Sequence, residues 1–288
     1  MEIFQILLNG VFLGGLYAIL AIGMSLVFGI MRLTNLAHGD LVILSTYLCM
    51  TIGAVTGNII IALIVSIGCM MIFGFLIQNV LVNRVMGTGP TAPLLVTFGV
   101  SIILANVLLQ VFGANSQTIY NSLSTSNVFT SELISISSLY LLDFVVAVVV
   151  IVALNLLMKR TFLGRAIRAT SDNPTAAELM GIGTKKMYSI AMVIAMVVAA
   201  IAGLLLGMTY VFYPSTGTSY LITAFGVVVI GGMGNLMGTL VGGLVLGIAQ
   251  LLGGYFFGPT YQLVTGYIVL LVILTIKPNG LLAGAARK

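Results

Sequence analysis

Long apolar runs separated by short polar stretches dominate this sequence. A helix needs about 20 mostly apolar residues to cross the hydrocarbon core of a bilayer. Nine apolar segments are candidates: Ile3–Met31, Leu41–Val55, Ile59–Val82, Leu94–Phe112, Leu139–Met158, Met187–Tyr210, Leu221–Ile230, Leu236–Leu252 and Leu263–Ile276. They are continuously apolar, whereas strands of a membrane barrel alternate apolar and polar residues. The pattern predicts an all-α polytopic integral membrane protein, a bundle of about seven to nine transmembrane helices.

The seventh segment is the least certain span. Leu221–Ile230 is short, and it runs into a glycine-rich stretch. The two segments on either side of this stretch either both cross the membrane, giving nine spans, or form a re-entrant hairpin beside seven. Broken membrane segments are tolerated where they face protein or a cavity, and in transporters they often lie near the substrate. A kink or tight turn explains the pattern equally. The candidate pathway residues here are Gly231, Gly232, Gly234 and Asn235.

Composition supports lipid as the main solvent. Of the 288 residues, 60% are hydrophobic and only 6% are charged, against about 25% charged in soluble domains. The polar stretch Ala114 to Ser138 is too short to bury a core of its own. Because no linker divides the chain, we predict one transmembrane domain, residues 1–288.

The basic residues predict an orientation. All eleven fall on one side of the membrane if the N-terminus is outside, and Lys and Arg are enriched in cytoplasmic loops. They are Arg32, Arg84, Lys159, Arg160, Arg165, Arg168, Lys185, Lys186, Lys277, Arg287 and Lys288. We therefore expect the C-terminus and the segment 159–186 in the cytoplasm. This distribution also explains the net charge of +5 without a nucleic-acid partner.

Glycines at four-residue spacing predict close helix packing, because paired small residues let two backbones approach. They occur at Gly10/Gly14, Gly203/Gly207, Gly234/Gly238/Gly242 and Gly243/Gly247. The signal is generic to membrane bundles and predicts compactness rather than one function.

Catalytic motifs are missing from the sequence. His38 is the single histidine, and neither a His-Glu-x-x-His zinc motif nor a phosphate-binding loop occurs. We predict a protein that is not an enzyme and that holds no metal or cofactor. Asp40 and Asp143 are expected near segment ends rather than at mid-membrane depth, which argues against a carrier driven by protons or sodium.

A polar cluster, Thr34 to Asp40, joins the first two segments and is expected near the inner surface. Asn35 or Asp40 is a candidate cap for the following helix. The alternative is a polar turn that lines or gates a passage, with Asn35, His38, Gly39 and Asp40 as its candidate residues.

The segment Lys159 to Lys186 is expected to be a long cytoplasmic loop containing a short helix. Ser171 or Asp172 precedes Pro174, a favourable helix start, and Gly181 supplies a stop. This helix would expose Leu179 and Met180. A solvated loop whose basic residues meet anionic lipid explains the composition too, but a helix that docks onto a cytoplasmic partner is the sharper hypothesis.

Three stretches resemble the shorter, LivH-like permease subunits of ATP-binding-cassette importers for branched-chain amino acids. The first is Gly14–Gly23 continuing to Asn35–Asp40. The second is Gly164–Ala169 with Asp172, Asn173, Pro174, Ala176, Ala177 and Met180–Ile182, and the third is Val229–Asn235 with Gly238, Gly242 and Gly243. Order and spacing match over nearly the whole chain.

The resemblance implies the rest of a transport complex in a bacterial inner membrane. A second homologous permease would complete the pathway, two cytoplasmic ATPase subunits would bind ATP–Mg, and an extracytoplasmic binding protein would deliver the amino acid. The coupling residues implied are Arg165, Arg168, Asp172, Asn173, Pro174, Ala177, Glu178 and Gly181. Relatives that carry urea or amides leave the substrate open. A self-sufficient channel or carrier for a small neutral solute, and a membrane enzyme or scaffold, remain as alternatives.

Overall fold

The computed structural model describes residues 2–89, 91–121, 127–131 and 134–282. Almost all of the regular structure is helical. The helices are α1 Glu2–Met31, α2 His38–Thr56, α3 Ile59–Leu76, α4 Asn83–Val85, α5 Thr91–Phe112, α6 Ser138–Arg160, α7 Phe162–Asp172, α8 Pro174–Leu179, α9 Thr184–Thr209, α10 Gly217–Gly231, α11 Leu236–Phe257 and α12 Gln262–Ile276. A π-helix, η1 (Ile77–Val82), joins α3 to α4, and single 3₁₀ turns precede α10 and α12.

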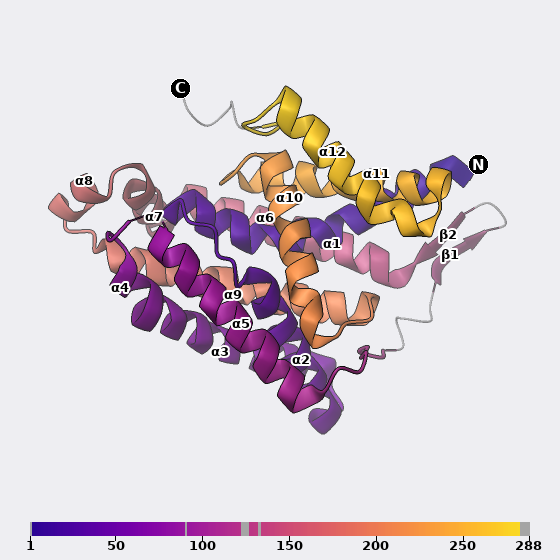
Figure 1. Ribbon diagram of the computed structural model, residues 1–288, viewed down its shortest axis with the longest axis horizontal. Coiled ribbons are helices and arrows are strands. Elements are labelled where there is room, and N and C mark those ends of the chain that lie inside the picture. Colours follow the sequence, from indigo (N-terminus) through magenta and orange to yellow (C-terminus); the bar gives the residue numbers. More distant parts are fainter. Residues whose placement is uncertain (1, 90, 122–126, 132–133, 283–288) are drawn as a thin grey trace.

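Helix α1 forms the centre of the bundle. All of its residues from Leu13 to Val27 are buried, and α6, α9, α10 and α11 pack around it. Figure 1 shows the N-terminus and the antiparallel pair β1 (Asn127–Ser131) and β2 (Ile134–Ser137) at one end of the molecule. Helices α7 and α8 lie at the opposite end. The long helices therefore run between a hairpin end and an α7–α8 end.

The contact between α1 and α11 depends on two facing glycine pairs. A methyl group added at Gly14 would lie 2.6 Å from Leu244 Cα, and one at Gly10 would lie 2.8 Å from Ile248 Cα. On the other helix, a methyl group at Gly243 would lie 2.5 Å from the Gly14 carbonyl oxygen. The backbones of α1 and α11 are thus in direct contact, as the glycine spacing predicted.

Nine helical segments in the described part of the chain are long and apolar enough to cross a bilayer. Their bounds agree with the nine apolar runs, with differences of a few residues at the ends. The seventh and the ninth are the shortest. Helix α10 has 15 residues, about 22 Å at 1.5 Å per residue, and the preceding turn extends this span to Pro214–Gly231. The fold class predicted from the sequence is confirmed.

Candidate functional site

A non-helical connection enters the bundle between α1 and α2. Helix α1 ends at Met31, and the chain reaches α2 only at His38. The His38 Nε2 atom donates to the Leu20 carbonyl oxygen at 2.8 Å, and the His38 ring lies beside Gly23. Because Leu20 and Gly23 occupy the middle of α1, the first turn of α2 lies at mid-depth. The prediction that this polar cluster lies near the inner surface was wrong.

The capping prediction for α2 also requires correction. Ala37 is the N-cap residue and makes no side-chain cap. Asn35 Oδ1 instead accepts the N–H of Ala37 at 3.0 Å, within the connection itself, and the N–H of Leu36 donates to Thr97 Oγ1 on α5 at 3.2 Å. Non-helical backbone at membrane depth must find such partners because lipid offers none.

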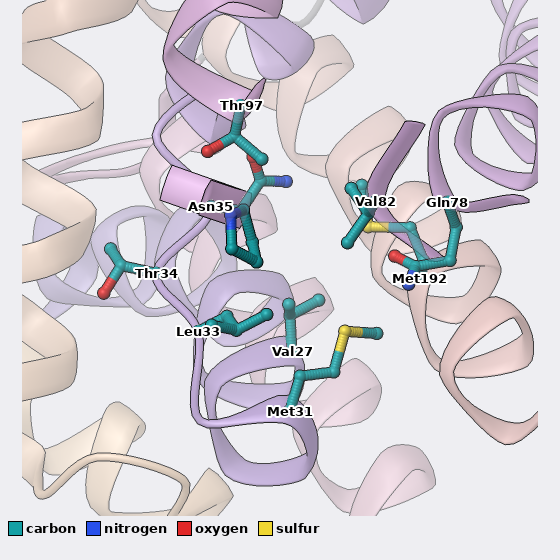
Figure 2. Close-up of a pocket in the computed structure, with 10 residues that line it drawn as sticks. Val27, Met31, Leu33, Thr34, Asn35, Gln78, Val82, Thr97 and Met192 are labelled. Atoms are coloured by element: carbon teal, nitrogen blue, oxygen red, sulfur yellow. The ribbon is translucent and has the colours of Figure 1, made fainter. Parts of the chain in front are cut away.

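A small cavity adjoins this connection. Figure 2 shows Asn35 and Thr97 on one side, Val27 and Met31 on another, and Gln78 across from them. The Asn35 Nδ2 atom is buried and has no hydrogen-bond partner among the described residues. The cavity measures about 20 Å³, which holds about one water molecule. This conformation therefore has no room for an amino acid beside Asn35.

Asp40 is a carboxylate at mid-depth. It is only 2% exposed, and its Oδ2 accepts a hydrogen bond from Ser101, halfway along α5, at 2.5 Å. A methyl group added at Gly217 would lie 2.0 Å from Asp40 Oδ1, and one at Gly39 would lie 1.9 Å from the Gly217 carbonyl oxygen. The first turns of α2 and α10 are thus in direct contact.

Asp40 lies near the start of a helix, as predicted, because it is in the first turn of α2. That helix begins inside the bundle, however, so the expectation that Asp40 avoids the membrane interior was wrong. Asp143, in the second turn of α6, is fully buried and accepts from Thr209 Oγ1 at 2.9 Å. Buried ionisable groups in a membrane bundle are costly and mark functional positions by default.

Polar side chains on the outside of the bundle mark one face. The exposed large side chains of α3 and α12, and those of α6 before its basic last turn, are apolar, as contact with lipid requires. Asn106 and Gln110 on α5, and Thr218 and Ser219 in the first turn of α10, are exposed. We call this the α5–α10 face. It is mixed rather than wholly polar, because large apolar side chains such as Phe98 and Val107 on α5 are exposed as well.

The segment between α6 and α9 is mostly helical, which corrects the prediction of a long loop. Lys159 and Arg160 end α6, and Lys185 and Lys186 lie in the first turn of α9. Thr161 Oγ1 accepts the N–H of Gly164 at 3.0 Å and begins α7. Helix α7 was not predicted, although Thr161 is a favourable N-cap and the residues after it have an amphipathic pattern.

Helix α7 is bound to the ends of two long helices. The Arg165 Nη1 and Arg168 Nη2 atoms donate to carbonyl oxygens in the last turn of α6, those of Arg160 and Met158, at 3.3 and 3.2 Å. The Ser171 hydroxyl donates to the Gly29 carbonyl oxygen near the end of α1 at 2.6 Å. Any displacement of α7 would therefore reach α1.

Helix α8 confirms the predicted short helix, with a different start. Its N-cap is Asn173, whose Oδ1 accepts the N–H of Ala176 at 3.0 Å, because Ser171 and Asp172 belong to α7. Pro174 follows as the first helical residue. Gly181, with φ of 81°, ends the helix where the N–H of Ile182 donates to the Ala177 carbonyl at 3.0 Å.

The C-terminal end of α8 exposes two large apolar side chains. Leu179 is 84% exposed and Met180 is 82% exposed, whereas Ala177 is 4% exposed. The Glu178 carboxylate accepts a hydrogen bond from Thr184 at the start of α9. One face of α8 is thus held against the protein, and its two large apolar side chains project away from it. The predicted exposure of Leu179 and Met180 is confirmed, whereas docking onto a partner stays a prediction.

The glycine-rich stretch forms the turn between α10 and α11. Gly232 and Gly234 have positive φ angles, 101° and 81°. Gly234 also contacts Gly29 near the end of α1. Asn235 is the N-cap of α11, because its Oδ1 atom accepts the N–H of Gly238 at 3.1 Å. Gly231 is 14 residues from Gly217, about 21 Å along α10. The two predicted pathway clusters are therefore not brought together.

The nine span-length helices in the described part of the chain, with a polar non-helical connection inside their bundle, define a multi-span membrane protein. Residues 6–275 match the family model described as branched-chain amino acid transport system / permease component. The chain belongs to this family, and the resemblance noted in the sequence is confirmed.

Named relatives cover almost the whole chain. The high-affinity branched-chain amino acid transport system permease protein BraD of Pseudomonas aeruginosa is 33% identical over 96% of this chain and 95% of its own. LivH of Escherichia coli strain K12, of the same description, is 30% identical, covering 96% and 94%. A probable LivH of Methanocaldococcus jannaschii is 27% identical, covering 96% and 91%. The relatives are named as permease components, which are transport proteins.

Among solved structures, PsaBC from Streptococcus pneumoniae in complex with Fab aligns over 96% of this chain and 93% of its own. The TM-score is 0.49 at 16% identity, a similarity too low to assign the fold.

Proposed function

We propose that this chain is one permease subunit of an ATP-driven importer for branched-chain amino acids, acting as a single membrane domain. A second homologous permease would cover the α5–α10 face defined above and complete the pathway. Two ATPase subunits would bind ATP–Mg and dock on α8, and a binding protein on the other side would supply the substrate. Lipid would surround the remaining faces in a bacterial inner membrane.

The observation that carries the proposal is the exposed apolar tip of α8 on a family permease. Leu179, the last residue of α8, and Met180, which follows it, project from the side opposite the buried Ala177. Large side chains that become buried when a partner binds supply much of the energy of protein interfaces. All eight residues that the sequence suggested for coupling lie in or beside α7 and α8. Ala177 is buried, and the other seven are exposed: Arg165, Arg168, Asp172, Asn173, Pro174, Glu178 and Gly181.

A continuous set of contacts leads from the docking helix to the pathway. Helix α8 packs on α7, and Ser171 on α7 bonds Gly29 near the end of α1. The connection that follows α1 carries Asn35 and leads to Asp40. A push on α8 would therefore move the end of α1 and the non-helical connection, which borders the small cavity described above.

The orientation follows from the basic residues. Helices α7 and α8 carry or flank most of them, and this end of the molecule would face the cytoplasm. The N-terminus, at the opposite end with the β1–β2 pair, would lie outside, and the C-terminus inside.

Reconstitution tests the function. In proteoliposomes that hold the permease pair and ATPases, with binding protein outside and ATP inside, labelled leucine should accumulate, and it should not when ATP is omitted. A matched preparation that contains this chain alone is the control. Leucine entry through the chain alone, without ATP, would overturn the proposal in favour of a self-sufficient carrier.

A further inference from the structure

Asp40 is a buried carboxylate without a positively charged partner. The Ser101 hydroxyl donates a hydrogen bond to its carboxylate, and no Lys, Arg or His of the described chain forms an ion pair with it. His38, two residues away, is held by the Leu20 carbonyl oxygen instead. A negative charge at this depth is costly unless a positive group compensates it.

The Asp40 carboxylate lies directly behind the α5–α10 face. Ser101, which covers one carboxylate oxygen, is half-buried. Gly217 lies against the other oxygen, and the exposed residues Thr218 and Ser219 follow it in α10. A modest separation of α5 from the first turn of α10 would open the carboxylate to a molecule on this face.

A transported amino acid brings the missing positive charge. Its ammonium group has three donors and fits a carboxylate in a charge-assisted hydrogen bond. We propose that the Asp40 carboxylate receives the ammonium group of the amino acid during passage, with Ser101 holding the carboxylate when no substrate is present. This inference rests on the proposed function, because it requires an amino acid in the pathway.

The competing explanation is that Asp40 only stabilises α2. An acidic residue in the first turn of a helix interacts favourably with the helix dipole. Asp40→Asn separates the two explanations, since asparagine keeps the size of the side chain and an oxygen that accepts from Ser101 but removes the charge. A helix-stabilising role predicts altered thermal stability, and it predicts no change in which ligands the site prefers.

Ligand protection of a nearby thiol tests the site directly. Thr218→Cys, in a complex whose Cys49 and Cys69 are replaced by Ala, is reacted with a neutral methanethiosulfonate reagent. The added ligands are isopentylamine, which keeps the ammonium group and branched chain, and isocaproate, which keeps the branched chain and a carboxylate. We expect isopentylamine to slow the reaction about tenfold and isocaproate to leave its rate unchanged, given the strength of charged hydrogen bonds.

The same measurement in the Asp40→Asn background supplies the decisive comparison. Protection by isopentylamine should be lost while the unprotected reaction rate stays the same. Equal protection with and without the Asp40 charge, or protection by neither ligand, would overturn the inference. ATP-driven leucine uptake by the wild-type complex is scored separately. If the wild-type complex takes up leucine but isopentylamine does not protect the cysteine at position 218, only the proposed role of Asp40 is refuted. If the wild-type complex takes up no leucine, the proposed function is contradicted.

Discussion

Gly14→Leu is expected to prevent the protein from folding stably in the membrane. The new side chain would begin 2.6 Å from Leu244 Cα and 2.8 Å from the Gly243 carbonyl oxygen, and a backbone cannot yield as a flexible side chain can. Helix α1 would have to separate from α11 along its central contact. We expect a loss of about 3 kcal/mol or more in the free energy of unfolding, the upper end of overpacking costs, measured by thermal unfolding in detergent.

Gly68→Leu is the matched control for this variant. Gly68 lies within α3, another span, and a methyl group added there meets no atom within 4 Å. The same substitution should leave the unfolding temperature unchanged or raise it, because leucine favours a helix more than glycine does. Unfolding curves of the Gly14→Leu protein that superpose on those of the wild type would show that the α1–α11 contact is not as close as described.

Adding charge to the tip of α8 is expected to separate the permease from its ATPases. In the double variant Leu179→Glu with Met180→Glu, both side chains are more than four-fifths exposed, so the bundle should fold normally. Loss of two apolar anchors at an interface costs about 2 kcal/mol or more, roughly thirtyfold in affinity. The expected results are weak co-purification of the ATPases and loss of ATP-driven leucine uptake.

The control for the charged α8 variant places the same charge at the other end of the molecule. Tyr120 is 88% exposed and lies in the connection between α5 and β1, so Tyr120→Glu should preserve ATPase binding. Normal uptake by the double α8 variant would show that the ATPases bind elsewhere and would remove the coupling role of α8.

The spans were predictable because lipid imposes a simple rule. Each backbone group must be satisfied within a helix, so continuous apolar runs become helices. Helix α8 was predictable for a local reason, since Pro174 fixes its start and Gly181 its end. The glycine pairs at Gly10/Gly14 and Gly243/Gly247 were recognised, but their pairing with one another is a property of the folded bundle.

The depth of the connection before α2 was not predictable from its residues. Asn35, His38 and Asp40 have the composition of a surface turn, and what carries them inside is tertiary. His38 bonds a carbonyl in the middle of α1, and Gly39 rests on Gly217, far away in sequence. Helix α7 was not predicted because its basic residues suggested a solvated loop. In the structure, Arg165 and Arg168 bind carbonyl oxygens at the end of α6.

The sidedness of the α7–α8 end is the claim on which the importer account depends most directly. A cysteine at the exposed position Thr175, in a protein lacking Cys49 and Cys69, can be challenged with a membrane-impermeant thiol reagent added to intact cells. The account predicts no labelling at Thr175→Cys until the membrane is permeabilised, and labelling of Tyr120→Cys without permeabilisation. Labelling of Thr175→Cys from outside intact cells would contradict it.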